Sequence, residues 1–386
     1  MLDLIEWLMS YETLRVIWWL FMGVLLIGFA VMDGFDLGVG ALLPFLGRTD
    51  SERRVIINAI APTWEGNQVW LILGAGAIFA AWPAVYGAAF SGFFIVLIVT
   101  LFALILRPVG FKYRSLIGNP RWRAFWDWCL FIGAVIPSVV FGVAFGNLLL
   151  GVPFHFDDDL RVFYTGSFWG LLNPFGLLAG VISLSMLLMH GAVFLQLKAG
   201  APIRDRAQSL VRRFGIALIA SFVLAGLAVV FVIDGYVVTH FAGTEGASNP
   251  LTKEVIREHG AWLDNYGRYP LTILAPLLGI GATVLTIRLS SSGRAGLAFI
   301  TSGLAIGGVI LTAGFAMFPF IMPSSSDPGS SLTVWDATSS LLTLRWMFWG
   351  TVIFLPIIIF YTSWVYSKMR GPVTLEAIER DTGNLY

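Results

Sequence analysis

Acidic side chains stand inside two strongly apolar stretches of this 386-residue chain. Asp33 and Asp36 lie within residues 29–38, and Glu65 lies within residues 61–70. An acidic residue at the centre of a membrane-spanning helix costs about 2.5–3.5 kcal/mol on insertion scales, so such residues usually face protein or water and mark proton or ion routes. The chemistry that these carboxylates suggest is proton transfer.

The spacing of these residues places them on shared helix faces. Asp33 and Asp36 are three positions apart, as are Glu65 and Gln68, and Trp64 stands four positions before Gln68. Side chains three or four positions apart are neighbours on one side of a helix. The two helices should pack antiparallel because their connection is short, so we expect the two polar faces to meet around a short file of water. A carboxyl group in such a place is suited to take up and release protons.

A structural interpretation competes with this one. Asn67 and Gln68 could serve as hydrogen-bond donors that hold the acids and fix helix packing. Elsewhere the structural interpretation is the stronger one. Asp127 is expected to form a surface ion pair, Asp234 to lie at the membrane interface or cap a helix, and His190 to be a hydrogen-bonded core residue.

The chain is poorly equipped to ligate a haem or a metal. None of its four histidines has a second histidine at helical spacing, although one histidine with a distant partner residue stays an alternative. The single cysteine, Cys129, allows neither an internal disulfide nor a thiolate cluster.

The composition is that of an all-α membrane protein. Hydrophobic residues make up 57% of the chain, charged residues only 12%, and the net charge of +1 gives no argument for nucleic acid. Membrane-spanning helices need about 20 predominantly apolar residues. This criterion predicts a single integral membrane domain over residues 1–386 with nine spans, near 15–46, 58–81, 84–106, 124–151, 164–197, 213–240, 269–288, 295–322 and 341–367.

Basic residues orient these spans. The connections after spans one, three, five and seven, together with the C-terminal tail, hold eighteen Lys and Arg residues, against six on the other side. Because the cytoplasmic side keeps the basic excess, we expect an outer N-terminus and a cytoplasmic C-terminus. Asp36 and Glu65 then belong to the cytoplasmic half.

The first and fifth spans exceed thirty residues, so each should tilt, kink or project beyond the bilayer. Candidate kinks are Gly34, Gly38 and Gly40 in the first span and Pro174 with Gly176 in the fifth. Residues 323–331 are expected to form a flexible outer loop.

Several motifs carry a family resemblance across essentially the whole chain. They include Asp33-Gly-Phe-Asp36, Gly66-Asn-Gln-Val-Trp70, Arg107-Pro-Val-Gly110 and the run from Leu332 to Ser340. Together they resemble subunit II of cytochrome bd ubiquinol oxidase.

The resemblance implies a haem-free subunit of a bacterial inner-membrane complex that oxidises quinol and reduces oxygen to water. The b and d haems and the site of quinol oxidation belong to the partner, subunit I, so the isolated chain would do no chemistry. The resemblance also implies contact with membrane lipid and quinone. It is compatible with a small accessory subunit in the complex. Some members hold a bound quinone in subunit II, which these residues do not locate. The implied fold is two four-helix bundles with one peripheral helix.

The family also associates subunit II with a proton path from the cytoplasm. Its carboxylate after the Trp of the second span corresponds to Glu65, where well-known members have Asp, and Asp36 and Trp64 match positions around the same path. Asp33, Asn67 and Gln68 would support it. Two alternatives stay open: a purely structural scaffold subunit, and an ion-coupled secondary transporter, which would also place acids in kinked midplane helices.

Overall fold

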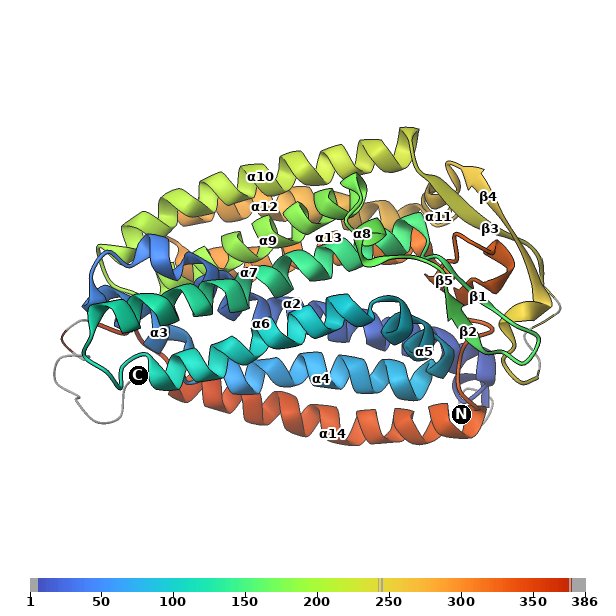
Figure 1. The fold of residues 1–386 in the computed structure, drawn as a ribbon, viewed down its shortest axis with the longest axis horizontal. Coiled ribbons are helices and arrows are strands. Elements are labelled where there is room, and N and C mark those ends of the chain that lie inside the picture. The colour runs from blue at the N-terminus through green and yellow to red at the C-terminus, as the bar shows by residue number, and fades with distance from the viewer. Residues whose placement is uncertain (1–5, 242, 244–245, 375, 377–386) are drawn as a thin grey trace.

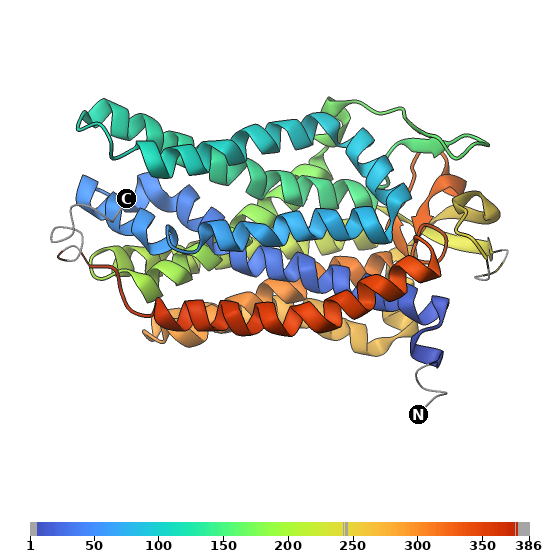
Figure 2. The ribbon, with the colours of Figure 1, turned by 90° about the horizontal axis from the view of Figure 1, so that it is seen from below.

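The computed structural model describes residues 6–241, 243, 246–374 and 376, and most of them are helical (Figure 1). Nine described helices have 18 residues or more, and they run side by side along the long axis of the molecule (Figures 1 and 2). They are α2 (Tyr11–Leu46), α4 (Trp64–Ala81), α6 (Phe94–Tyr113), α7 (Pro120–Leu150), α9 (Pro174–Lys198), α10 (Ile203–Phe231), α12 (Leu274–Ser291), α13 (Ala295–Met317) and α14 (Leu341–Lys368).

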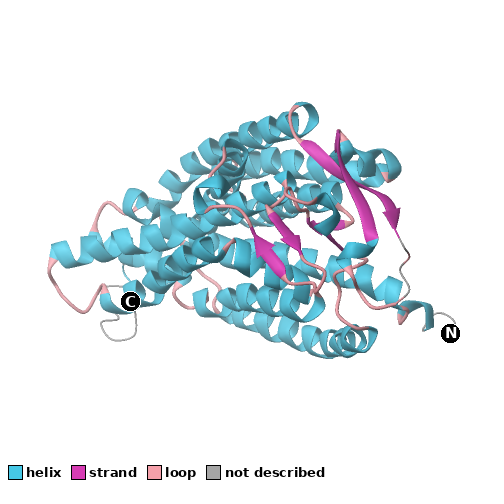
Figure 3. Cartoon of the chain, turned by 45° about the vertical axis from the view of Figure 1, so that its right-hand side comes forward, coloured by secondary structure: helices cyan, strands magenta, loops and turns pink. Residues whose placement is uncertain are grey.

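Shorter elements connect the long helices. Four short helices are α3 (Asp50–Ile60), α5 (Pro83–Gly92), α8 (Phe168–Leu171) and α11 (Asp264–Arg268). The strands are β1 (Phe154–Phe156), β2 (Val162–Tyr164), β3 (Asp234–Phe241), β4 (Lys253–His259), β5 (Phe320–Met322) and β6 (Leu332–Thr333). They form three antiparallel pairs, β1 with β2, β3 with β4 and β5 with β6, and gather at one end of the molecule (Figure 3).

Each predicted span overlaps one of the nine long helices. Eight helices of the described part are long and apolar enough to cross a membrane. The exception is α4, which begins with the polar residues Glu65, Asn67 and Gln68.

Several predicted boundaries were wrong because local signals end a helix inside an apolar run. The fifth span does not kink at Pro174. Instead, the Asn173 side chain caps a new helix, α9, with Pro174 at its first position, where the missing N–H costs nothing. The second span begins at Trp64 because residues 50–60 form the separate helix α3, and the predicted third span is divided between α5 and α6. Spans six and eight end early, at Phe231 and Met317, where the chain turns into β3 and β5.

The long helices form two bundles and one peripheral helix, as predicted. In the first bundle α2 packs against α4 and α7, and α6 packs against α7. In the second, α9 packs against α10 and α13, and α12 packs against α10 and α13. The bundles meet where α2 and α7 contact α9, while α14 packs against the first bundle, along α2 and α4.

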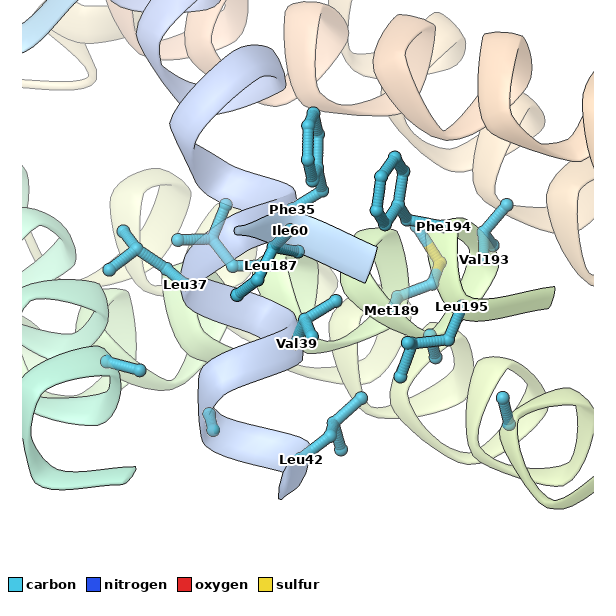
Figure 4. Packing of buried hydrophobic residues seen from close by; sticks show 14 of the residues in the cluster. Phe35, Leu37, Val39, Leu42, Ile60, Leu187, Met189, Val193, Phe194 and Leu195 are labelled. Atoms are coloured by element: carbon cyan, nitrogen blue, oxygen red, sulfur yellow. The ribbon is translucent and has the colours of Figure 1, made fainter. Parts of the chain in front are cut away.

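The core between the bundles is apolar and closely packed. Figure 4 shows Phe35 of α2 beside Phe194 of α9, and their rings stack with centroids 4.0 Å apart. Glycines permit this approach: a Cβ on Gly38 would overlap the Leu187 carbonyl oxygen, and one on Gly191 would lie 2.6 Å from the Gly38 carbonyl carbon. The two backbones therefore touch at this crossing.

The loop at residues 323–331 is not the flexible segment that its composition predicts. Ser324, Ser330 and Ser331 are fully buried, and the Ser331 hydroxyl accepts a hydrogen bond from the Ser324 backbone at 2.9 Å. Near this loop, Lys253 at the start of β4 forms a buried ion pair with Asp336 at 2.8 Å. Buried polar contacts therefore help to order this loop, beside the apolar clusters at the same end of the molecule.

Candidate functional site

Asp33 is neutralised by an arginine from another helix. The Arg107 guanidinium on α6 donates from both terminal nitrogens to Asp33 Oδ1, each at 3.1 Å. Both side chains are almost wholly buried, at 2% and 0% exposure. The sequence predicted Arg107 in a connection between spans, whereas it lies within α6, six residues before the helix ends at Tyr113. Asp33 is therefore held as one half of a buried ion pair.

Asp36, one turn further along α2, has a different environment. Its Oδ2 accepts a hydrogen bond from Asn67 Nδ2 of α4 at 2.8 Å, while its buried Oδ1 has no hydrogen-bond partner among the described residues. The Asn67 Oδ1 in turn accepts a hydrogen bond from the Tyr366 hydroxyl of α14 at 2.6 Å. Three helices thus converge on one carboxylate.

The expected meeting of Glu65 and Gln68 with the acidic face of α2 does not occur. Asn67 faces Asp36 instead, while Glu65 is exposed and Gln68 is partly exposed. Asn67 stands two residues after Glu65, about 200° around the helix, so both cannot point into the same interface. Trp64 is buried with its ring 5.2 Å from that of Phe111, which anchors the first turn of α4.

Asp36 also differs from the other buried acids. Of the five buried acidic residues in the described part of the chain, four form an ion pair with a basic side chain. These are Asp33 with Arg107, Glu52 with Arg206, Asp127 with Arg53 and Arg114, and Asp336 with Lys253. Asp36 has no ion pair within 4 Å among those residues. Since an isolated buried carboxylate is costly, an unpaired one is a candidate functional group.

The partners of Asp127 contradict its interpretation as a surface ion pair. Its carboxylate is 1% exposed and accepts hydrogen bonds from Arg114 at 2.6 Å and from Arg53 at 2.7 Å. It therefore ties α3, the end of α6 and the start of α7 together. Both partners come from other elements, so the sequence around Asp127 could not identify them.

His190 is the core residue that the sequence predicted. It is fully buried, with Nδ1 2.7 Å from the Ser302 hydroxyl and Nε2 3.0 Å from the Val31 carbonyl oxygen. Asp234 is the first residue of β3 and is half-exposed. Its Oδ1 lies 3.6 Å from Nδ1 of His259. In the described residues no three or more His, Cys, Asp or Glu side chains gather to hold a metal ion.

An apolar cavity of about 670 Å³ lies between the long helices. It is lined mainly by α2, α4, α7, α9, α10 and α13, and polar groups are scarce in its wall. Aromatic side chains, among them Phe29, Trp70 and Phe141, form part of the lining. A space of this size and apolar lining suits an apolar ligand.

The fold and the site define a polytopic helical membrane protein in which one buried carboxylate of the described part lacks an ion pair and lies at a junction of three helices. The same architecture occurs in a chain of the bd oxidase from Geobacillus thermodenitrificans, with a TM-score of 0.68 over 92% of this chain and 98% of that one, at 16% sequence identity.

Sequence comparison identifies the family. The model of the cytochrome bd terminal oxidase subunit II family matches residues 14–369. Cytochrome bd-I ubiquinol oxidase subunit 2 of Escherichia coli strain K12 is 54% identical over 98% of this chain and 100% of its own length. Cytochrome bd ubiquinol oxidase subunit 2 of Bacillus subtilis is 31% identical over 94% of this chain and 97% of its own length. The chain belongs to the family of cytochrome bd terminal oxidase subunit II, and is a subunit of a cytochrome bd ubiquinol oxidase.

Proposed function

We propose that this subunit supplies part of a proton path, which runs from the cytoplasmic side toward the oxygen-reducing haems of subunit I. In this proposal Asp36 carries protons inside the subunit and Glu65 takes them up at its surface. The observation that supports it best is the state of Asp36, a buried carboxylate with one unbonded oxygen and no ion pair among the described residues. A group that must gain and lose a proton cannot be locked to a permanent cation, as Asp33 is by Arg107.

The depth of the two acids agrees with this role. Asp36 lies ten residues before the end of α2 at Leu46, or about 15 Å along the helix axis. Glu65 lies in the first turn of α4, close to the same end of the bundle. Its side chain is exposed on this chain, which leaves it open to water or to the partner subunit. Trp64, Asn67 and Gln68 then position the start of α4 around the path.

Such a path has an energetic consequence for the complex. Protons consumed in water formation would come from the cytoplasm, while quinol oxidation releases its own protons on the outer side. The reaction would therefore build a membrane potential without a separate pump. The b and d haems, in this proposal, are held by subunit I, and this chain contributes none of their ligands.

The test compares oxygen consumption by the purified two-subunit complex with a soluble quinol, at matched haem content. Glu65→Gln and Asp36→Asn keep volume and hydrogen bonding while removing the titratable proton. We expect each to lose about tenfold or more in turnover, equivalent to about 1.4 kcal/mol in the barrier. Asp158→Asn, which changes an exposed acid at the strand end of the molecule, is the matched control. Wild-type turnover in both path variants, with unchanged haem spectra, would leave this subunit as a scaffold.

We also propose that the apolar cavity holds the tail of a bound quinone. Its volume and apolar lining suit an isoprenoid chain better than a polar cofactor. Gly226 lines the cavity and has open space where a Cβ would point, so Gly226→Phe should fill the cavity. We expect this variant to purify with less extractable quinone than wild type. Gly23→Phe on α2, also facing open space, is the control, and equal quinone content in all three proteins would contradict the proposal.

A further inference from the structure

Tyr366 gives the last helix a polar contact with the carboxylate site. The buried residues of α14 are Leu344 and Phe348, both near its beginning. Tyr366 lies 18 residues beyond Phe348, close to the end of the helix at Lys368, and packs against the main hydrophobic core. Its hydroxyl donates to Asn67 Oδ1 at 2.6 Å. The Tyr366 side chain is therefore held in place by a hydrogen bond and by packing, although most of α14 is exposed.

This contact sets the direction of the Asn67 amide. An asparagine side chain presents an oxygen acceptor on one side and an NH2 donor on the other. When Tyr366 donates to the oxygen, the NH2 group is turned toward Asp36, which it reaches at 2.8 Å. A donor at this distance stabilises the ionised carboxylate relative to the protonated one. The reversed amide would instead present its oxygen to Asp36 and favour the protonated carboxyl group.

We infer that Tyr366 is a positioning residue of the proton path: through Asn67 it holds the donor that stabilises ionised Asp36 and so promotes release of the proton. This inference rests on the proposed function of Asp36. It assigns a role to the peripheral helix, because α14 would control how firmly the carboxyl group holds its proton. A displacement of α14 would loosen that control.

The other charged and titratable groups near Asp36 have partners of their own. On its own helix, Asp33 is neutralised by Arg107 of α6. From α9, His190 is engaged with the Val31 carbonyl oxygen and with Ser302 of α13. Among the described residues, the hydrogen bond that Asp36 itself accepts comes from Asn67 on α4.

The test follows proton binding directly in the intact two-subunit complex. The infrared band of the protonated Asp36 carboxyl group can be identified by its loss in Asp36→Asn, and its amplitude titrated against pH. We expect Tyr366→Phe, which keeps the ring, to move the titration midpoint upward by about one pH unit, a tenfold change in proton affinity. The alkaline limit of turnover should move in the same direction. Tyr361→Phe, on the exposed face of the same helix, should change neither.

A second variant separates positioning from a merely structural role. Asn67→Leu removes the donor and keeps Tyr366, so it should produce the same shift, and the double variant should shift no further. If Tyr366→Phe lost haem content, Tyr366→Met, which also removes the hydroxyl, would replace it in the test. An unmoved midpoint in the Tyr366 variant would overturn the inference even if Asn67→Leu moved it or Asp36→Asn abolished turnover. If Asp36→Asn turned over like wild type while the midpoint moved, the positioning would stand and the proposed function would fail.

Discussion

At the scale of single residues, the buried ion pair between Asp33 and Arg107 leaves Asp36, the neighbouring acid, without a basic partner among the described residues. Asp33 receives both terminal nitrogens of Arg107 and has no exposure, so removing the arginine would leave an uncompensated buried charge. We expect Arg107→Gln to destabilise the complex by about 3–5 kcal/mol. Thermal unfolding of the purified complex at matched haem content measures this loss.

The double variant Asp33→Asn with Arg107→Gln should recover part of that stability, because it removes both charges together. Lys112→Gln, an exposed charge on the same helix, is the control and should be close to neutral. A double variant no more stable than Arg107→Gln alone would show that packing around the guanidinium, rather than charge, dominates.

Glu52 provides a pH-dependent prediction at the same scale. Burial raises the pKa of Glu52, but hydrogen bonds from the Arg206 side chain and the Arg48 backbone outweigh it, so the pKa lies below its usual value of 4.5. A carboxyl group with a lowered pKa stabilises the folded state above about pH 4.5 and loses that contribution as pH falls through its folded-state pKa. We expect Glu52→Gln to cost about 1.5–3 kcal/mol at pH 7 and progressively less toward pH 3.5. Thermal melts of both proteins across this range measure the gap, and a gap independent of pH would refute the assignment.

At the scale of elements, the crossing of α2 and α9 depends on two glycines that touch. A Cβ at Gly191 would lie 2.6 Å from the Gly38 carbonyl carbon and the Val39 nitrogen, so Gly191→Ala must push the helices apart. We expect it to cost at least about 1–3 kcal/mol, as overpacking does, and to lower the yield of assembled complex. Gly23→Ala on α2 has open space and should be neutral or slightly stabilising, since alanine is the better helix former. Equal melting temperatures for the two variants would show that the crossing can relax.

At the scale of the whole molecule, the strand-rich end and the opposite end should face different sides of the membrane. The distribution of basic residues predicts that the strand-rich end is outside. A cysteine replacing exposed Asp158, between β1 and β2, should react with an impermeant maleimide in spheroplasts. A cysteine replacing exposed Ser292, between α12 and α13, should react only in inverted vesicles. The native Cys129 is buried and gives the background. The reverse labelling pattern would invert the topology and place Asp36 in the outer half.

Long apolar runs were enough to predict the membrane class and the nine long helices, because the bilayer demands about 20 apolar residues per span whatever the neighbours are. The two-bundle arrangement was predicted from the family resemblance instead. Helix ends were predicted less well. A cap such as Asn173 before Pro174 stops a helix within an apolar run, and a window of hydrophobicity averages over it. The motifs around Asp33, Glu65 and Arg107 also predicted the family of the chain. The match of the family model to residues 14–369 confirms that prediction.

The partners of each acid came from the folded chain alone. Helical spacing correctly grouped Asp33 with Asp36 on one face, but it could not say that Arg107 reaches the first, or that Asn67 and Tyr366 connect to the second. The physical reason is that periodicity gives the side of a helix on which a residue lies, whereas the rotation of that helix against its neighbours depends on the packing of many side chains at once. For α4, that rotation turned Asn67 inward and Glu65 outward. Residues 299 positions apart, Asn67 and Tyr366, met for the same reason.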